Sequence, residues 1–189
     1  SGREGFPMKG LVRAAGIAGG FLLSGCLVSS SPLFDASNAA ATPLAAGVYE
    51  ACSGSANETE VECNPMTVEI GVDGLYTLGV EDDRIEARFH ELGGADYAMQ
   101  MTESDDDDFM YYWGKLDNGA MRITLLWCQD LPRALVDKLV KDGSVEADQD
   151  YSTCTAKTAS AVIAAAKSYA AGEAVSDDFV VIRPAVSAQ

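Results

Sequence analysis

The sequence is poor in histidine and in basic residues, and these two shortages exclude several classes of function. Its 189 residues include one histidine and 13 lysines and arginines against 29 aspartates and glutamates, which gives a formal net charge of −16. A chain with this charge is repelled by nucleic acid and by anionic lipid headgroups. We therefore expect no nucleic-acid partner and no attachment to a membrane through the protein surface alone.

The motifs of common catalytic sites are also missing. The chain contains no Gly-x-Ser-x-Gly motif, no phosphate-binding loop, no dinucleotide-binding fingerprint and no Cys-x-x-Cys or His-x-x-x-His spacing. The single histidine, His90, continues the charged face of a strand expected around residues 84–90, so we expect its side chain to face solvent and not to act in catalysis. No cofactor is expected, and no carboxylate pair stands out for acid–base chemistry.

Four consecutive aspartates at positions 105–108 form the densest cluster of charge in the chain. Asp105 and Asp107 are candidates for weak cation binding, because Ca²⁺ favours several carboxylate oxygens. Successive side chains of an extended segment point to opposite sides, however, so the four carboxylates cannot converge on one ion. We expect a solvated turn here and no dedicated metal site.

Residues 1–25 have the character of an export signal. We expect the native chain to start at Met8, with a basic segment over residues 8–13 and an apolar run over residues 14–23. The apolar run is shorter than the roughly 20 residues that a membrane-spanning helix needs. The alternative is an uncleaved anchor helix over residues 11–28.

The run ends in Leu23-Ser24-Gly25-Cys26, which resembles the lipobox of bacterial lipoproteins. The resemblance covers residues 8–26 and implies cleavage before Cys26, a lipid on its thiol and acylation of its amino group. More than one acyl chain gives stable anchoring, so the lipid on Cys26 is the expected contact with the membrane. The resemblance also implies a cell-envelope location. In a Gram-negative cell, this would be the periplasmic face of the outer membrane, because the residue after Cys26 is not aspartate.

The remaining cysteines are Cys52, Cys63, Cys128 and Cys154. An even number in an oxidising compartment predicts two disulfides, for which three connectivities are open. We favour Cys52–Cys63 and Cys128–Cys154, because each pair closes a short loop between neighbouring elements. A metal site is disfavoured, because the spacings typical of zinc ligands are absent.

The chain after the signal divides into two parts. Residues 26–46, the lipidated cysteine and a stretch rich in Ser, Ala, Asn, Thr and Pro, are expected to form a flexible tether. Residues 47–189 are expected to form one α+β domain stapled by the disulfides. The tether would then hold this domain away from the membrane.

Within this domain, apolar residues first alternate with a period of two. This alternation predicts an antiparallel β-meander of about six strands between residues 47 and 127, which could close partly into a barrel. Two helices, over residues 130–143 and 156–171, and a short last strand over residues 179–182 follow. We expect Asp130 to cap the first helix, Thr153 or Thr155 to cap the second, and both helices to pack on the meander.

Several aromatic residues are candidates for a binding surface. A pocket for an apolar or sugar-like ligand could use Tyr97, Tyr111, Trp113 and Trp127, together with Met99, although aromatic stripes usually supply core area. The leading hypothesis is a membrane-tethered, non-enzymatic binding or interaction module with an unidentified envelope protein as partner. The alternatives are a carrier of a small ligand and a hydrolase with acidic catalytic residues.

Overall fold

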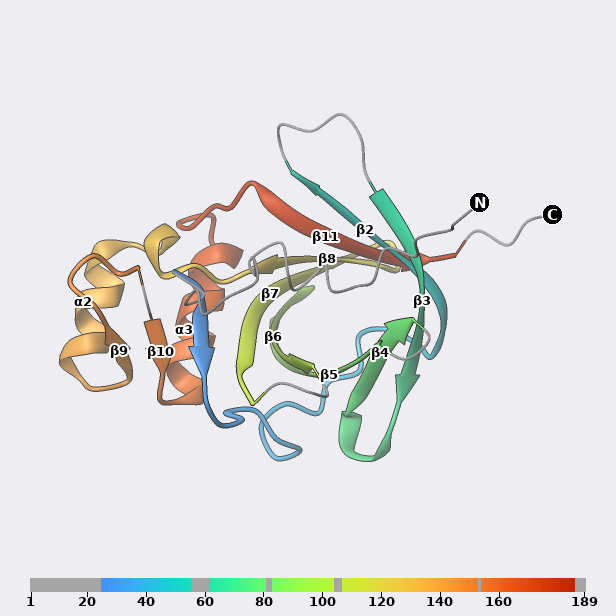
Figure 1. Cartoon of the computed structure of the whole chain (residues 1–189), viewed down its shortest axis with the longest axis horizontal. Coiled ribbons are helices and arrows are strands. Elements are labelled where there is room, and N and C mark those ends of the chain that lie inside the picture. The colour runs from blue at the N-terminus through green and yellow to red at the C-terminus, as the bar shows by residue number, and fades with distance from the viewer. Residues whose placement is uncertain (1–24, 56–61, 81–82, 104–106, 153, 186–189) are drawn as a thin grey trace, which may run out of the picture.

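The structure is a computed structural model that describes residues 25–55, 62–80, 83–103, 107–152 and 154–185. Its main body is a closed barrel of eight antiparallel strands (Figure 1). In order around the barrel, the strands are β2 (Gly47–Ser55), β3 (Glu62–Ile70), β4 (Tyr76–Val80), β5 (Asp83–Gly93), β6 (Asp96–Glu103), β7 (Phe109–Asp117), β8 (Ala120–Leu125) and β11 (Asp178–Pro184). Pairing of β11 with both β8 and β2 closes the ring.

The predicted meander is confirmed in kind, but the expectation of about six strands is wrong. The last strand, β11, inserts between β8 and β2, where Val180 pairs with Ile123 on one side and Ser53 on the other. Two helices separate β11 from β8 in the chain. Hydrophobic alternation identifies a strand but carries no information on which distant strand it joins, so closure could not be read from the period.

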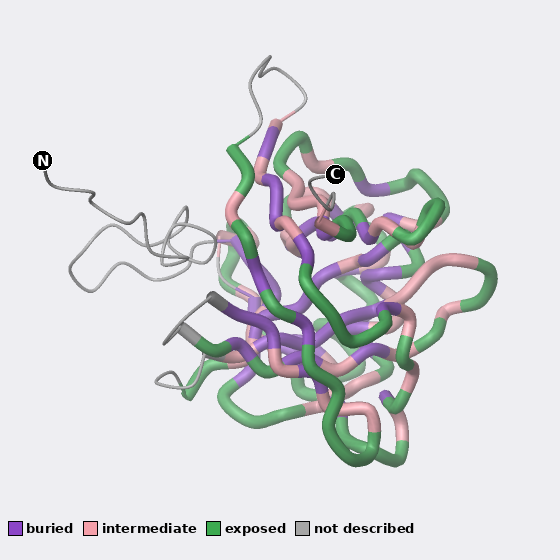
Figure 2. The backbone as a smooth tube through the Cα atoms, turned by 90° about the vertical axis from the view of Figure 1, so that its right-hand side faces the viewer, coloured by how far each residue is buried: buried purple, intermediate pink, exposed green. Residues whose placement is uncertain are grey.

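Side chains fill the interior of the barrel. Tyr76, Phe89 and Met99 are each 0% exposed, and Figure 2 shows buried residues along the barrel strands, with exposed residues at many of the turns. The five methionines of the described residues all belong to this core: Met66, Met99, Met101, Met110 and Met121. An eight-stranded barrel is just wide enough to be filled by side chains, and flexible thioethers adapt to its irregular gaps.

A second layer lies beside the barrel. Here β1 (Leu27–Ser29) pairs with β7, β10 (Cys154–Ala156) pairs with β1, and β9 (Val145–Ala147) pairs with β10. Helices α2 (Arg133–Lys141) and α3 (Ala159–Ala170) lie on this side, with α3 packed across β6 and β7 (Figure 1). Short 3-10 turns occupy η1 (Val72–Gly74) and η2 (Cys128–Asp130). No helix in the described ranges has the length and apolar character needed to cross a membrane.

The two helices are confirmed, but their caps differ from expectation. α2 starts after Pro132 without a side-chain cap, and Asp130 lies before it in η2, where its carboxylate accepts a hydrogen bond from the Tyr169 hydroxyl. α3 is capped by Thr158, whose Oγ1 accepts from the backbone N–H of Ala161. Both helices are shorter than the ranges expected for them, 130–143 and 156–171, so each helix starts later in the chain than expected.

Residues 27–46 belong to the fold, so the expectation of a flexible tether is wrong. Leu27 and Phe34 are each 1% exposed, and Leu44 is 2% exposed. The backbone N–H of Ala41 donates to the carbonyl of Phe89, which extends the segment along the barrel. The buried residues are spaced too widely among small polar ones to produce a helical or strand period, which is why the composition resembled a linker.

Gln100 fastens this segment to the outside of the barrel. Its Oε1 accepts from the backbone N–H groups of Leu33 at 2.8 Å and Phe34 at 2.9 Å, and its Nε2 donates to the Phe34 carbonyl at 3.2 Å. The Tyr111 hydroxyl donates to the same Oε1 and lies 2.6 Å from the Ser29 hydroxyl. Because Gln100 is only 5% exposed, its hydrogen bonds replace water for the backbone groups of Leu33 and Phe34.

Substituting Gln100→Leu should lower the free energy of unfolding by about 2–4 kcal/mol, because the buried N–H of Phe34 and the partly buried N–H of Leu33 lose their acceptor. Urea denaturation measures this loss. The matched control is Gln149→Leu at an exposed position, which should change stability by less than about 0.5 kcal/mol. Equal effects of the two substitutions would contradict the fastening role.

Candidate functional site

Cys26 lies immediately before β1, inside the fold. The residue is 0% exposed. On its C-terminal side, the N–H of Leu27 donates to the Leu126 carbonyl at 2.8 Å. On its N-terminal side, the N–H of Cys128 donates to the Gly25 carbonyl at 2.6 Å. The backbone is therefore held immediately before and immediately after the cysteine.

Gly25 is buried against Trp127. Its φ of +98° suits a glycine, and an added Cβ would lie 3.3 Å from Cε3 of the Trp127 ring and 3.6 Å from the Gln129 side chain. Trp127 itself is half-buried and forms an isolated antiparallel bridge with Cys26. A small residue is thus needed here for packing, in addition to any requirement of signal cleavage.

Burial also determines the chemistry of the Cys26 thiol. Desolvation raises the pKa of the thiol to about 11, the nearby Asp108 carboxylate acts in the same direction, and a backbone hydrogen bond opposes both. A thiol of this kind is a poor nucleophile while the domain is folded. A thioether-linked lipid at this sulfur requires the side chain to leave its buried position, although the backbone from Leu27 onward can stay in place.

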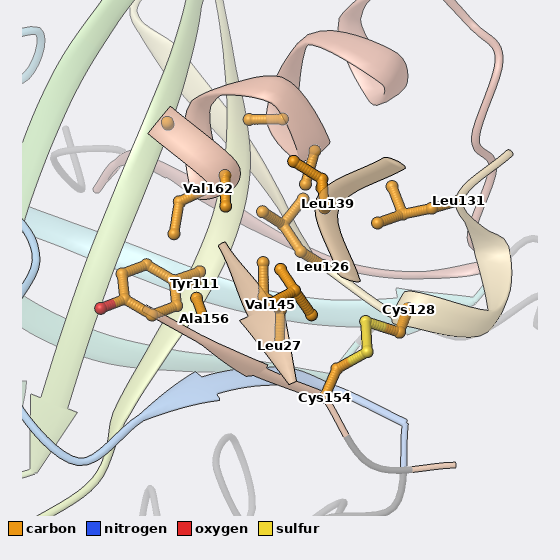
Figure 3. Close-up of a cluster of buried hydrophobic side chains, with 14 of the residues drawn as sticks. Leu27, Tyr111, Leu126, Cys128, Leu131, Leu139, Val145, Cys154, Ala156 and Val162 are labelled. Atoms are coloured by element: carbon orange, nitrogen blue, oxygen red, sulfur yellow. A yellow bond between two sulfur atoms is a disulfide. The ribbon is translucent and has the colours of Figure 1, made fainter. Parts of the chain in front are cut away.

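The two disulfides follow the favoured connectivity, which is confirmed. Cys52 pairs with Cys63 across β2 and β3, and Cys128 pairs with Cys154. Cys154 is the β10 partner of Leu27, so the second disulfide brackets the start of β1 (Figure 3). In the same view, Leu27 lies among the buried side chains of a hydrophobic cluster beside the barrel, which we call the lateral core. Its members include Leu27, Tyr111, Leu126, Val145 and Val162.

The aromatic candidates Tyr97, Tyr111, Trp113 and Trp127 do not gather around one pocket. Tyr97 packs against the core inside the barrel, whereas Tyr111 and Trp113 belong to the lateral core. The Trp113 indole N–H donates to Asp96 at 2.9 Å, and its ring lies 6.2 Å from that of Tyr169. Only Trp127 adjoins the Cys26 region, so the four residues mainly supply packing.

His90 is packed beneath the N-terminal segment, and the expectation that it faces solvent is wrong. Its ring stacks on Phe34 with the centroids 5.7 Å apart, and its Nδ1 donates to the Asn38 carbonyl. The side chain does point away from the barrel interior, as the alternation indicated. The residues that cover it come from the segment expected to be a tether, so the sequence pattern did not reveal that His90 is half-buried.

Carboxylates in the described ranges form no buried pair. The buried polar side chains there are those of Ser29, Gln100, Thr124 and Ser168. Asp130 is half-buried, and desolvation raises its pKa while the hydrogen bond from Tyr169 opposes the rise. Its charged neighbour Asp177 is exposed. This arrangement resembles a structural contact more than an acid–base pair.

The described part of the chain includes only one of the two candidate cation residues. Asp107 is exposed, and Asp105 lies outside the described residues. One group with metal-ligand types and spacing occurs in the described part of the chain: Glu50, Cys52 and Cys63. Its two sulfurs are joined in a disulfide, so they offer no thiolate to an ion.

No protein-family model, no curated protein and no solved structure matches the chain. The site must therefore be judged from its own geometry. Sequence reasoning found Cys26 but missed the three groups that surround it: the Gly25 carbonyl, the Cys128 N–H and the Trp127 ring. Backbone donors and acceptors leave no signal in a sequence, and Gly25 already had an explanation as part of the lipobox.

In the uncleaved folded chain, Cys26 should react with a maleimide at pH 8 at least about a hundredfold more slowly than in denaturant. A pKa of about 11 leaves about 0.1% of the thiol as thiolate at this pH, against roughly a quarter for an ordinary cysteine. Mass spectrometry of the labelled chain gives both rates. Labelling at the same rate in both conditions would contradict the buried position.

Removing each disulfide in turn should distinguish a loss of overall stability from a local loosening of β1. By loop-closure entropy, Cys128→Ala with Cys154→Ala should cost about 3.5 kcal/mol, and Cys52→Ala with Cys63→Ala about 2.8 kcal/mol, for separations of 26 and 11 residues. Only the first pair should also speed hydrogen exchange at the Leu27 amide beyond the global change. Equal protection of Leu27 in both variants would show that the disulfide does not hold β1.

Proposed function

We propose that the chain is a lipid-anchored protein of the cell envelope, with acylated Cys26 as its membrane anchor. The observation that carries the proposal is the lipobox-like Leu23-Ser24-Gly25-Cys26, which ends immediately before β1. Pairing of the other four cysteines in two disulfides supports an oxidising compartment. The net charge of −16 makes the lipid, and not the protein surface, the contact with an anionic membrane.

On this anchor, the domain acts as a non-enzymatic interaction module for another envelope protein. Two observations support this role. The barrel is filled by its own side chains, with Tyr76, Phe89 and Met121 each 0% exposed, so it favours a rigid scaffold over a container. The chemically versatile His90 and Asp130 are both engaged in contacts that hold the fold together.

A carrier of a small apolar ligand is the second candidate. The five buried methionines favour it, because flexible thioether side chains can repack around a guest more easily than branched ones. A ligand would then occupy the barrel core in place of repacked side chains. This candidate differs from the first in requiring a stoichiometric small molecule.

The anchor is tested by expressing the full chain and Cys26→Ser in a bacterium supplied with labelled fatty acid. The original chain should carry the label and sediment with membranes, whereas the Cys26→Ser chain should carry none, because the thiol that accepts the lipid is absent. Cys52→Ala with Cys63→Ala is the matched control, and it should keep the label. Labelling of the Cys26→Ser chain would overturn the proposal.

Native mass spectrometry of the protein extracted from membranes distinguishes the module from the carrier. The interaction module should show the mass of the acylated chain alone, whereas a carrier should retain one additional small molecule. Met99→Leu with Met101→Leu serves as the matched variant, because it preserves apolar volume but reduces flexibility. A bound molecule that is lost in this variant would favour the carrier.

A further inference from the structure

The hydrogen bond from the Cys128 N–H to the Gly25 carbonyl is broken by the proposed processing. The bond is 2.6 Å long, and both residues are buried. Cleavage before Cys26 removes Gly25 and its carbonyl. The Cys128 N–H then needs another acceptor, because a buried donor without a partner destabilises a fold.

Cleavage also creates an amino group at the same place. The new N-terminus would be the nitrogen of Cys26, a residue that is 0% exposed and bridged to Trp127. An ammonium group in such a position would lose its hydration, a cost that the charge of the nearby Asp108 carboxylate offsets only in part. An ammonium group can only donate hydrogen bonds, so it could not replace the Gly25 carbonyl as the acceptor for the Cys128 N–H.

We propose that an acyl group on the amino nitrogen of Cys26 takes the place of Gly25, with its amide carbonyl accepting the hydrogen bond from the Cys128 N–H. This inference rests on the proposed function. Gly25 has no side chain, so its carbonyl and Cα correspond atom for atom to the carbonyl and first methylene of a fatty-acyl amide. The first methylene then lies beside the Trp127 ring and the Gln129 side chain, where Gly25 now lies.

The chemical step conserves the amide at this position. The Cys26 nitrogen attacks an acyl ester of a phospholipid, an amide C–N bond forms, and the ester C–O bond breaks. The amine proton leaves with the lysophospholipid alcohol, and no oxidant or reductant is needed. The product restores the planar, uncharged amide that the uncleaved chain has between Gly25 and Cys26.

This arrangement places the anchor directly on the domain. Leu27 is held by the Leu126 carbonyl, so only Cys26 separates the fixed strand from the lipid. Trp127 is half-buried beside the same point, and tryptophan is suited to the boundary between lipid headgroups and water. The side of the domain around Trp127 therefore lies nearest to the lipid, and the domain has little freedom to turn relative to its anchor.

The test compares three forms of the protein in detergent: the uncleaved full chain with Cys26→Ser, the processed chain with lipid on the thiol only, and the processed chain with the amino group also acylated. The two processed forms come from bacteria that lack or possess the acyltransferase for the amino group. Hydrogen exchange of the Cys128 amide, resolved by NMR, reports the hydrogen bond. The Leu116 amide, which donates to Ala95 at a barrel turn, is the internal control.

The Cys128 amide should be equally protected in the uncleaved and the amino-acylated forms, and should exchange at least about tenfold faster in the form with a free amino group. The Leu116 amide should exchange alike in all three. Equal protection of Cys128 in the two processed forms would overturn this inference and leave the anchor intact. Absence of any acyl group on Cys26 by mass spectrometry would overturn the anchor itself, and this inference with it.

Discussion

The insertion of β1 between β7 and β10 is the interaction on which the lateral layer depends. β1 is antiparallel to β7 and parallel to β10, and the β9–β10 pair reaches the barrel sheet only through it. Without these three residues, strand edges on both sides would lose their partners, and backbone groups in the core would need others. Leu27 adds apolar burial to the same core that α2 and α3 cover. A strand of only three residues thus joins the two parts of the molecule.

The segment that follows β1 shows how a polar-looking stretch can be ordered without a secondary-structure period. The side chain of Gln100 accepts hydrogen bonds from the backbone of this segment, and the Tyr111 and Ser29 hydroxyls complete the buried network. Leu44 packs into the barrel core. These contacts are made one at a time, by residues from distant strands. Because of these contacts, the segment expected to be a flexible tether is packed along the barrel. The domain therefore has a fixed position relative to Cys26.

Local features of the sequence predicted much of the fold. The alternation after residue 66 marked β3 to β8, the change of period marked both helices, and loop length selected the two disulfides that are present. Non-local features were beyond its reach: the pairing of β11 with β2, the insertion of a three-residue β1, and the cover over His90. At the candidate site, Cys26 was identified from its motif. Its surroundings are formed by backbone groups of residues 126–128, whose approach depends on the whole lateral layer.

The place of β1 in the chain has a consequence for the order in which the fold forms. β1, the first strand of the described residues, needs partners at Met110 and Cys154, which are synthesised much later. Closing contacts over such distances is slow and entropically costly, so β1 stays unpaired while the downstream strands emerge. During this interval the thiol of Cys26 is accessible to solvent, and the pairing of β1 then buries it. The late pairing of β1 therefore separates a period in which this thiol is accessible from the folded state, in which the unmodified thiol is enclosed.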